Sequence, residues 1–214
     1  MSQKTQMSRF RIITARVYLA SLFVILLSGI TVAVPIHWTI ESGGNGHWYE
    51  PVYVPGGISW TDARDTASSI LPNGYLATIS SATENSFVFS LIDEDKYWYY
   101  DTPNGGSFGP WLGGTDDGTE GNWRWITGEI WDYTNWHSSQ PDNWAGIENY
   151  LHFYWNAAPL RETTWNDLAN WPLLPITAIK GYVVETIPEP LSIVTLLCLI
   201  TLGRFTDINR KYSI

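Results

Sequence analysis

The sequence predicts one α+β domain in which two early helices precede an antiparallel sheet with long loops. Two amphipathic segments with helix-capping residues lie before Lys96. From Lys96 to Glu185 the chain carries short alternating apolar runs separated by glycine-rich and polar stretches. The 13 Trp and 12 Tyr among 214 residues predict a core of large rings whose N–H and O–H groups need partners. A hydrophobic content of 44% excludes a largely disordered chain.

The N-terminal segment has the composition of a targeting signal. In residues 1–33, basic side chains precede an apolar stretch, VYLASLFVILLSGITVAV, with small residues near Ala33, which is typical of a secretory signal peptide. An uncleaved signal anchor is the alternative, because this stretch is nearly long enough to span a bilayer. We expect residues 34–44 to be a linker and residues 45–185 to form the folded domain.

The C-terminal segment, residues 186–214, contains Pro188-Glu189-Pro190, the apolar run LSIVTLLCLITLG and scattered basic residues. It resembles the PEP-CTERM sorting tail of exported bacterial proteins, which implies processing by an exosortase. A plain membrane anchor is the alternative, although the apolar run is shorter than the ~20 residues that a helix needs to cross hydrocarbon. Both interpretations predict an exported protein at the cell envelope, at the cell surface or in the extracellular medium.

Charge and cysteine content narrow the choice of partners. The formal net charge is -9, and most basic residues lie near the two ends, so the domain itself is strongly acidic. Nucleic acid is therefore not expected as a partner, since phosphate binding needs a basic face, whereas cations are favoured. The only cysteine, Cys198, lies in the C-terminal apolar run. The domain is expected to fold without an internal disulfide.

The first part of the domain alternates strands and helices. The segment HWYEPVYV alternates like a strand, and SWTDARDTASSIL is predicted to be a helix capped by Ser59 with Asp62 three residues later. YLATI at 75–79 is predicted to be a strand. A second helix is predicted from Ser81, again with an acidic residue three positions later and with apolar residues at helical spacing.

The second part of the domain lacks helical periodicity. Its apolar runs, WLGG, WRWI, YLHFYW and GYVVE, are predicted to be short strands. The connections between them are long, and long loops in a compact domain are usually functional. The candidate site is therefore expected in these loops.

Six motifs, taken in order, resemble the C-type lectin-like domain family. They are SWTDARDTASSILPNGYLATISSATENSFV, WLGG at 111–114, NWRWITGE at 122–129, NW at 135–136, QPD at 140–142 and WND at 165–167. The resemblance implies a C-type lectin-like fold with two helices, antiparallel sheets and a long calcium-binding loop region. At two family disulfides this chain has other residues, namely Ala67 with Val184 and Tyr150 with Asn170. Trp111, Trp123, Trp125 and Trp136 are expected in the core.

The resemblance implies a calcium site and, through it, a sugar site. Its metal ligands would be Gln140, Asp142, Glu148, Asn166 and Asp167, which are carboxylates and amides of the kind that Ca²⁺ prefers. Two sugar hydroxyls could complete the coordination shell, with carboxylates accepting hydrogen bonds and amide NH₂ groups donating them. The carbohydrate-binding residues would then be Gln140, Asp142, Trp144, Glu148 and Asn166.

The loop that carries QPD allows two finer predictions. We predict a cis Gln140–Pro141 bond in the calcium-bound form, which would aim the two flanking side chains the same way. In the family, Gln-Pro-Asp is associated with galactose-type sugars, so the resemblance implies a glycan with galactose or N-acetylgalactosamine. Trp144 would stack on the sugar, although the NWAGI segment is shorter than the loop that usually supports this ring.

A second calcium site is also implied by the resemblance. Its ligands would be Asp116, Glu120, Asn143, Glu148 and Asn149. The alternative is that these are turn residues of a solvated loop.

Two other classes of function are alternatives to glycan binding. A protein-binding module that keeps the fold, with calcium only stabilising the loops, shares every scaffold motif. An enzyme is not expected: Asp142 and Glu148 could be a glycosidase pair, but they alternate with amides and a proline in a pattern that suits coordination. The four histidines, His37, His47, His137 and His152, have no metal or triad spacing.

Overall fold

Among the residues that the structure describes, nine strands form one sheet at the centre of the domain. The computed structural model describes residues 34–101, 105–170 and 179–187. In chain order the strands are β1 (Ile36–His37), β2 (Trp48–Tyr53), β3 (Tyr75–Leu76), β4 (Tyr99–Asp101), β5 (Gly106–Thr115), β6 (Arg124–Trp125), β7 (Tyr150–Trp155), β8 (Trp165–Leu168) and β9 (Gly181–Thr186).

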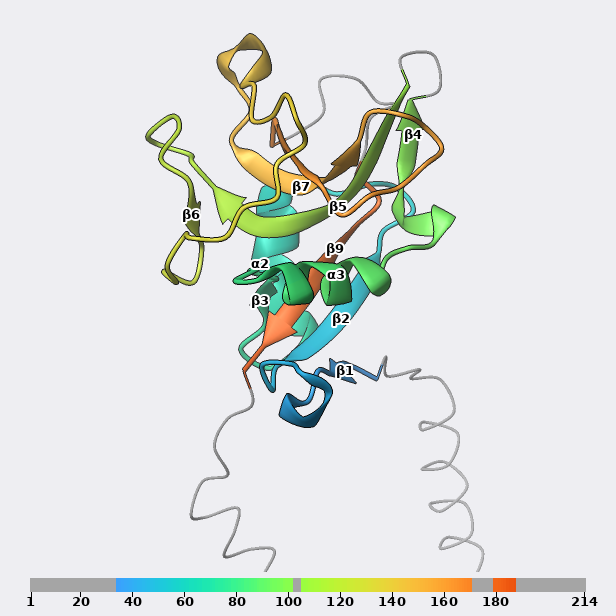
Figure 1. Ribbon diagram of the computed structural model, residues 1–214, viewed down its shortest axis with the longest axis vertical. Coiled ribbons are helices and arrows are strands. Elements are labelled where there is room, and N and C mark those ends of the chain that lie inside the picture. The colour runs from blue at the N-terminus through green and yellow to red at the C-terminus, as the bar shows by residue number, and fades with distance from the viewer. Residues whose placement is uncertain (1–33, 102–104, 171–178, 188–214) are drawn as a thin grey trace, which may run out of the picture. The chain divides into compact units, whose positions relative to one another are not determined.

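The sheet brings distant parts of the chain side by side (Figure 1). Its main path runs β1-β2-β9-β5-β7-β8, while β3 pairs with β9, and β4 and β6 pair with β5. Between the described strands, every pairing is antiparallel except that of β5 with β9, which is parallel through Trp111 and Tyr182. The sheet is therefore mostly antiparallel, as the sequence predicted, with one parallel pairing. This parallel pairing arises because β9 lies between β2 and β5.

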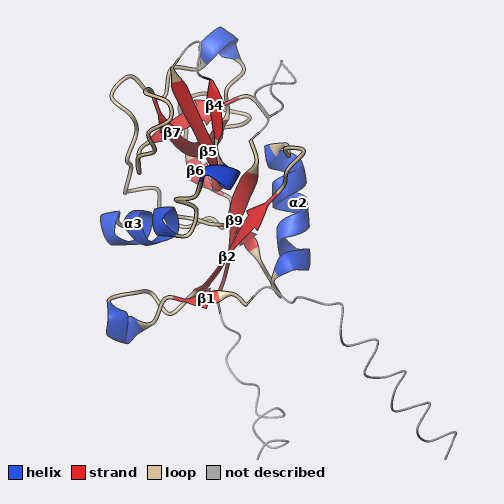
Figure 2. Cartoon of the chain, turned by 90° about the vertical axis from the view of Figure 1, so that its right-hand side faces the viewer, coloured by secondary structure: helices blue, strands red, loops and turns tan. Residues whose placement is uncertain are grey.

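Two α-helices, α2 (Trp60–Ile70) and α3 (Ala82–Ser90), lie on opposite sides of the part of the sheet that contains β2 and β9 (Figure 2). Both begin at the predicted caps. The Ser59 side chain accepts a hydrogen bond from the Asp62 N–H, and the Ser81 side chain accepts one from the Glu84 N–H. Short 3-10 helices form at Ile40–Ser42, Asp95–Tyr97 and Trp144–Gly146.

Each α-helix covers its own hydrophobic core. Beneath α2, Ala63 and Ala67 pack with Leu76, Trp111 and Val184. Ala67 and Val184, which lie where the resemblance implies a family disulfide, are thus both buried in the same cluster. The second core gathers next to α3 and consists mainly of large rings: Trp38, Tyr49, Tyr97, Trp98, Trp125, Phe153 and Trp165. Burying each such ring contributes roughly 2 to 3 kcal/mol, which is comparable to the ~2 to 4 kcal/mol that a disulfide typically contributes.

The WLGG motif lies in β5, and its first glycine, Gly113, is required for steric reasons. A Cβ atom on Gly113 would lie 2.4 Å from the Leu76 carbonyl oxygen. The Gly113 N–H donates to the Ala77 carbonyl at 2.8 Å, so β5 passes directly against the segment that follows β3. Only glycine permits this approach.

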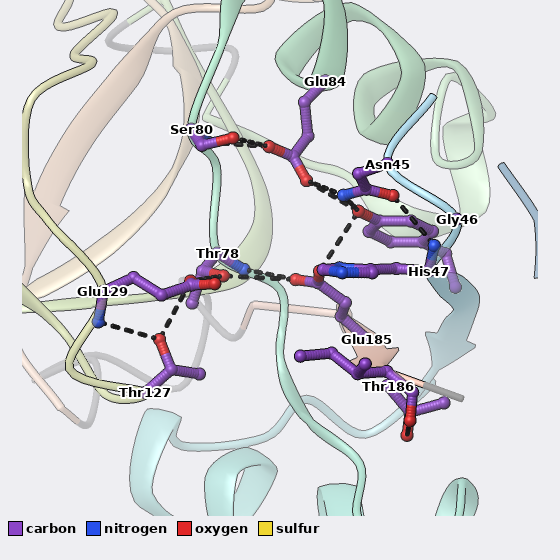
Figure 3. Close-up of polar contacts among 12 residues, drawn as sticks. Asn45, Gly46, His47, Thr78, Ser80, Glu84, Thr127, Glu129, Glu185 and Thr186 are labelled. Carbon is purple, nitrogen blue, oxygen red and sulfur yellow. Dashed lines mark hydrogen bonds and ion pairs between the residues drawn. The ribbon is translucent and has the colours of Figure 1, made fainter. Parts of the chain in front are cut away.

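A polar network, absent from the sequence predictions, joins β2, β9 and the start of α3 (Figure 3). The buried carboxylates of Glu84 and Glu185 flank the Tyr49 hydroxyl, which donates to Glu84 at 2.6 Å. Glu185 also accepts from the Thr78 N–H at 2.9 Å and lies 2.5 Å from His47 Nδ1. The hydrogen bond to Glu185 raises the pKa of His47, and burial raises the pKa of Glu185.

Some of the segment boundaries predicted from the sequence differ from those in the structure. The strand expected at 75–79 is confined to Tyr75–Leu76, because the chain then turns toward α3. Residues 34–44, expected to be a linker, contain β1, which pairs with β2, and a 3-10 helix. The predicted signal in residues 1–33 and the tail from residue 188 lie outside the described residues. Within the described ranges, no helix has both the length and the apolar character needed to cross a bilayer.

Candidate functional site

Three carboxylates converge where the β6–β7 connection meets β8. The side chains of Asp142, Glu148 and Asp167 each offer an oxygen, and these oxygens lie within 4.8 Å of one another. Glu148 is only 6% exposed and Asp167 only 1%, whereas Asp142 faces solvent. Two segments about 20 residues apart in the sequence thus supply one acidic cluster, as the sequence predicted for a cation site.

Strand β8 is held in place by Trp165. This ring is fully buried, and its Nε1 donates to the Asn85 Oδ1 of α3 at 2.8 Å. Its backbone N–H donates to the Asn135 carbonyl, and its carbonyl accepts from the His137 N–H. The WND motif therefore places Asn166 and Asp167 on an anchored strand beside the loop.

Backbone hydrogen bonds to the carboxylates close the loop. Asp167 accepts from the N–H groups of Asp142 at 3.1 Å and Asn143 at 2.8 Å. Glu148 Oε2 accepts from the Trp144 N–H at 3.0 Å, and the Glu148 N–H donates to Asn143 Oδ1 at 3.2 Å. Asn143 and Ala145 have φ values of 43° and 58°, in the left-handed region that a tight turn requires. The short NWAGI segment is thus a closed, hydrogen-bonded turn.

Two amide oxygens of the predicted ligand set are unpaired. Gln140 Oε1 and Asn166 Oδ1 are buried and have no hydrogen-bond partner within the described ranges. The Gln140–Pro141 bond is cis, the predicted isomer. Buried polar oxygens without partners are rare in folded proteins. Three carboxylates with two free amide oxygens form the hard oxygen set that suits Ca²⁺, so the residues present fit this ion.

Burial raises the pKa of two of the three carboxylates. Burial, with the negative charges of Asp167 and Asp142, raises the pKa of Glu148 to about 8. Burial also raises the pKa of Asp167. A bound cation would favour the charged form of both groups.

The proposed ligands of a second ion are only partly brought together. Glu120 accepts a short hydrogen bond from the Asn143 side-chain amide, and Asn143 contacts Glu148. Asp116 is buried; its Oδ2 accepts from the Gly121 N–H, while its Oδ1 has no partner within the described ranges. The backbone of Asn149 accepts a hydrogen bond from the Asp116 N–H and donates one to the Leu168 carbonyl. The second site thus remains a prediction.

The tryptophans separate into core and surface groups. Trp111 and Trp125 are buried, and Trp123 and Trp136 are partly buried against the core next to α3. Trp144, by contrast, is 63% exposed beside the carboxylate cluster. The sequence assigned these roles, with Trp144 alone placed to touch a sugar.

The sequence interpretation missed a role for His152. This side chain is fully buried on β7, opposite Asn166 of β8, and its Nε2 lies 3.1 Å from Asn166 Nδ2. Burial lowers the pKa of His152 to about 3, so the ring is neutral. The sequence around His152, YLHFYW, does not indicate this role, because the contact with Asn166 is made between two strands that lie apart in the sequence. His137 is also buried, with its ring packed edge-on to Tyr154 and Trp155.

This fold and oxygen cluster define a class of domain in which a loop region carries the candidate site. The model of the lectin C-type domain family matches residues 57–167, and the chain belongs to this family. Members of the family are in general binding proteins that lack enzymatic activity.

Individual relatives agree with the assignment. The chain is 30% identical to Lectin BRA-3 of Megabalanus rosa over 148 residues, covering 67% of this chain and 80% of that protein. It is 32% identical to echinoidin of Heliocidaris crassispina over 164 residues, covering 72% of this chain and 96% of that protein. The solved carbohydrate-recognition domain of cow CD23 has a TM-score of 0.50 and 21% identity, covering 68% and 92% of the two chains, which supports the fold alone.

Proposed function

We propose that this domain binds glycans through a calcium ion, with a preference for galactose or N-acetylgalactosamine. We further propose that it acts outside the cytoplasm, at the cell envelope or beyond it, because residues 1–33 have the composition of an export signal. The tail that contains Pro188-Glu189-Pro190 would attach the protein to the envelope or direct its processing by an exosortase.

The observation that carries the proposal is the pair of free oxygens, Gln140 Oε1 and Asn166 Oδ1. A buried carbonyl oxygen without a partner costs about 1 to 3 kcal/mol. Both oxygens belong to the predicted ligand set that includes the carboxylates of Asp142, Glu148 and Asp167. A divalent cation would satisfy the amide oxygens and neutralise the carboxylates together.

Sugar recognition would use groups around the ion. When bound, calcium supplies coordination positions that two neighbouring sugar hydroxyls can fill. The Gln140 amide would donate to a hydroxyl, and the exposed carboxylate of Asp142 would accept from one. The Trp144 ring is open to solvent and would pack against the apolar face of a galactose-type ring.

A second candidate is a protein-binding module in which calcium only stabilises the loops. The observation that favours it is the use of the carboxylates within the loop itself: Asp167 and Glu148 already accept three backbone hydrogen bonds. An ion at this position would strengthen the loop whether or not a sugar follows.

A glycan array probed with the full-length protein separates the two candidates. The proposal predicts binding to galactosides in calcium and its loss in a chelator. Trp144→Ala should weaken this binding while calcium affinity stays unchanged. An array without galactoside binding would overturn the sugar preference, and binding that survives the chelator would overturn the calcium dependence.

A further inference from the structure

Two of the few basic side chains in the domain meet at one pocket. Residues 34–187 contain only five basic residues against 19 acidic ones. Arg64 of α2 and Arg124 of β6 both line a pocket of about 470 Å³, a volume within the range of small-molecule sites. Its other lining residues are Trp60, Thr115, Asp117, Trp125, Ile126 and Gly128. None of the eight belongs to either predicted set of calcium ligands.

The pocket has a buried floor and a charged rim. Trp60 and Trp125 are 2% exposed and Thr115 is 4% exposed, whereas the two arginines are open to solvent. The Arg64 guanidinium lies over the Trp60 ring, 5.6 Å from its centroid, a cation–π contact that holds the long side chain at the rim. A ligand would thus rest on buried surface and reach exposed charge at the same time.

Arg124 is held by the turn beside it. Its Nη2 donates to the Asp117 carbonyl at 2.6 Å, and within the described ranges no carboxylate lies at ion-pair distance from it. A guanidinium has five N–H groups, so this bond leaves other donors available. Such a planar fork of donors suits an oxyanion that accepts two hydrogen bonds at once.

Arg64 is paired, but only with a solvent-exposed neighbour. Its Nε and Nη2 lie 2.7 and 2.6 Å from the Asp65 Oδ1, and the two side chains are 45% and 64% exposed. Exposed ion pairs of this kind add little stability. An anion in the pocket can therefore compete with Asp65 for the Arg64 guanidinium.

A carboxylate of the protein shares the rim. Asp117 Oδ2 accepts from the Tyr150 hydroxyl at 3.3 Å. Burial, with Asp117, raises the pKa of Tyr150, whereas Arg64 and Arg124 both oppose this rise, so the three charges act on one hydroxyl. Negative charge here disfavours a polyanion, such as an acidic peptide, in a domain that is already strongly acidic. It suits a ligand with one anionic group and several hydroxyls, because a carboxylate accepts from a hydroxyl.

We propose that this pocket binds an acidic saccharide unit, whose carboxylate or sulfate ester accepts hydrogen bonds from Arg64 and Arg124 and whose hydroxyls donate to Asp117. The site is separate from the carboxylate cluster at Asp142, Glu148 and Asp167, and it needs no calcium. Uronic acids and sulfated sugars both supply the single oxyanion that the arginines would recognise. The domain would then contact saccharides at two places with different chemistry.

Calorimetry of the full-length protein in a chelator tests the proposal independently of the calcium cluster. The probes are galacturonate, galactose 6-sulfate, neutral galactose and a triglutamate peptide. At least one acidic sugar should bind more tightly than galactose, and added salt should weaken that binding. Binding of one acidic sugar alone identifies the oxyanion as carboxylate or sulfate. If neither binds better than galactose, the proposal fails, and tighter binding of the peptide would overturn the choice of a saccharide.

Variants separate recognition at the pocket from general effects of charge. Arg64→Gln and Arg124→Gln should each weaken binding of the acidic sugar about 10-fold, as expected when a hydrogen bond to a charged group is lost. Lys96→Gln removes a positive charge outside the pocket and should bind like the wild type. Equal losses in Lys96→Gln and the two arginine variants would overturn the proposal.

A variant with the opposite expected effect guards against losses caused by misfolding. Asp117→Asn removes the negative charge from the rim but keeps an oxygen that can accept from Tyr150. It should strengthen the binding of inorganic sulfate, which has no hydroxyl to donate to this side chain. Unchanged or weaker sulfate binding in Asp117→Asn would show that the anion does not lie beside Asp117, and would overturn the proposed site.

Discussion

The carboxylate of Asp167 accepts a hydrogen bond from the backbone N–H of Asp142 at 3.1 Å. One predicted calcium ligand thus holds the loop that carries another. Asp167 bonds the next N–H as well, that of Asn143. Asp167 of β8 therefore holds the loop in shape without an ion. The two aspartates differ in role: the Asp167 side chain bonds the loop backbone, whereas the Asp142 side chain is exposed.

Replacing each aspartate should reveal this difference. Asp167→Ala removes the acceptor for two backbone N–H groups and should lower the free energy of unfolding of the calcium-free protein by about 2 kcal/mol. Asp142→Ala changes an exposed side chain and should shift it by less than about 0.5 kcal/mol. Denaturant unfolding with a chelator measures both. Equal losses in the free energy of unfolding for the two substitutions would refute the claim that Asp167 stabilises the loop.

The raised pKa of Glu148 predicts a dependence on pH. Its pKa in the folded protein is about 8, above its ordinary value of 4.5. The stability that this group contributes is therefore complete below about pH 4.5 and is lost as the pH rises through 8. Calcium binding requires the charged form, so affinity should rise from pH 6 to pH 8, with a proton released on binding at pH 7.

Glu148→Gln is the control for this prediction. Without calcium, the variant should gain stability relative to the wild type as the pH rises to 8, because its side chain does not titrate. Thermal unfolding at pH 6 and pH 8 measures the difference. A wild type and variant that respond identically to pH would show that Glu148 is already charged at neutral pH.

The His47–Glu185 pair predicts a second pH effect, far from the loop. His47 and Glu185 both have raised pKa values, so their contribution to stability is present at low pH and is lost as the pH rises through those values. His47→Ala leaves the buried carboxylate of Glu185 without this partner and should cost about 1 to 3 kcal/mol near neutral pH. His37→Ala, at an exposed histidine on the neighbouring strand, is the matched control. Similar losses in both variants would argue against the network.

Exchanging the acid and the amide around Pro141 should change the sugar preference. In Gln140→Glu combined with Asp142→Asn, the donor and acceptor positions are reversed while the number of oxygen ligands is kept. We expect binding to shift from galactosides toward mannosides on the same array, with calcium dependence retained. An unchanged sugar profile would mean that these two side chains do not select the ligand.

Local features of the fold could be predicted, whereas long-range pairing could not. Ser59 and Ser81 begin the two α-helices because capping depends on neighbours within one turn. The parallel contact of β5 with β9 depends on where a distant strand inserts, which no local pattern encodes. The same holds for His47 and Glu185, which lie 138 residues apart in the sequence.

In the candidate site, too, the residue types could be predicted from the sequence, whereas their long-range contacts could not. The residue types around Pro141 indicated cation ligands, and the structure brings the three carboxylates together. What the pattern could not show is the use of Asp167 to close the loop, or the burial of His152 behind Asn166. Both depend on the pairing of β7 with β8, which only the folded chain establishes.

A crystal structure of the full-length protein with calcium tests the central claim most directly. The account predicts an ion bound by Asp142, Glu148 and Asp167, with Gln140 Oε1 and Asn166 Oδ1 completing the protein ligands at about 2.3 to 2.6 Å. Crystals grown at saturating calcium that show no ion among these side chains, with both amide oxygens still unpaired, would contradict it.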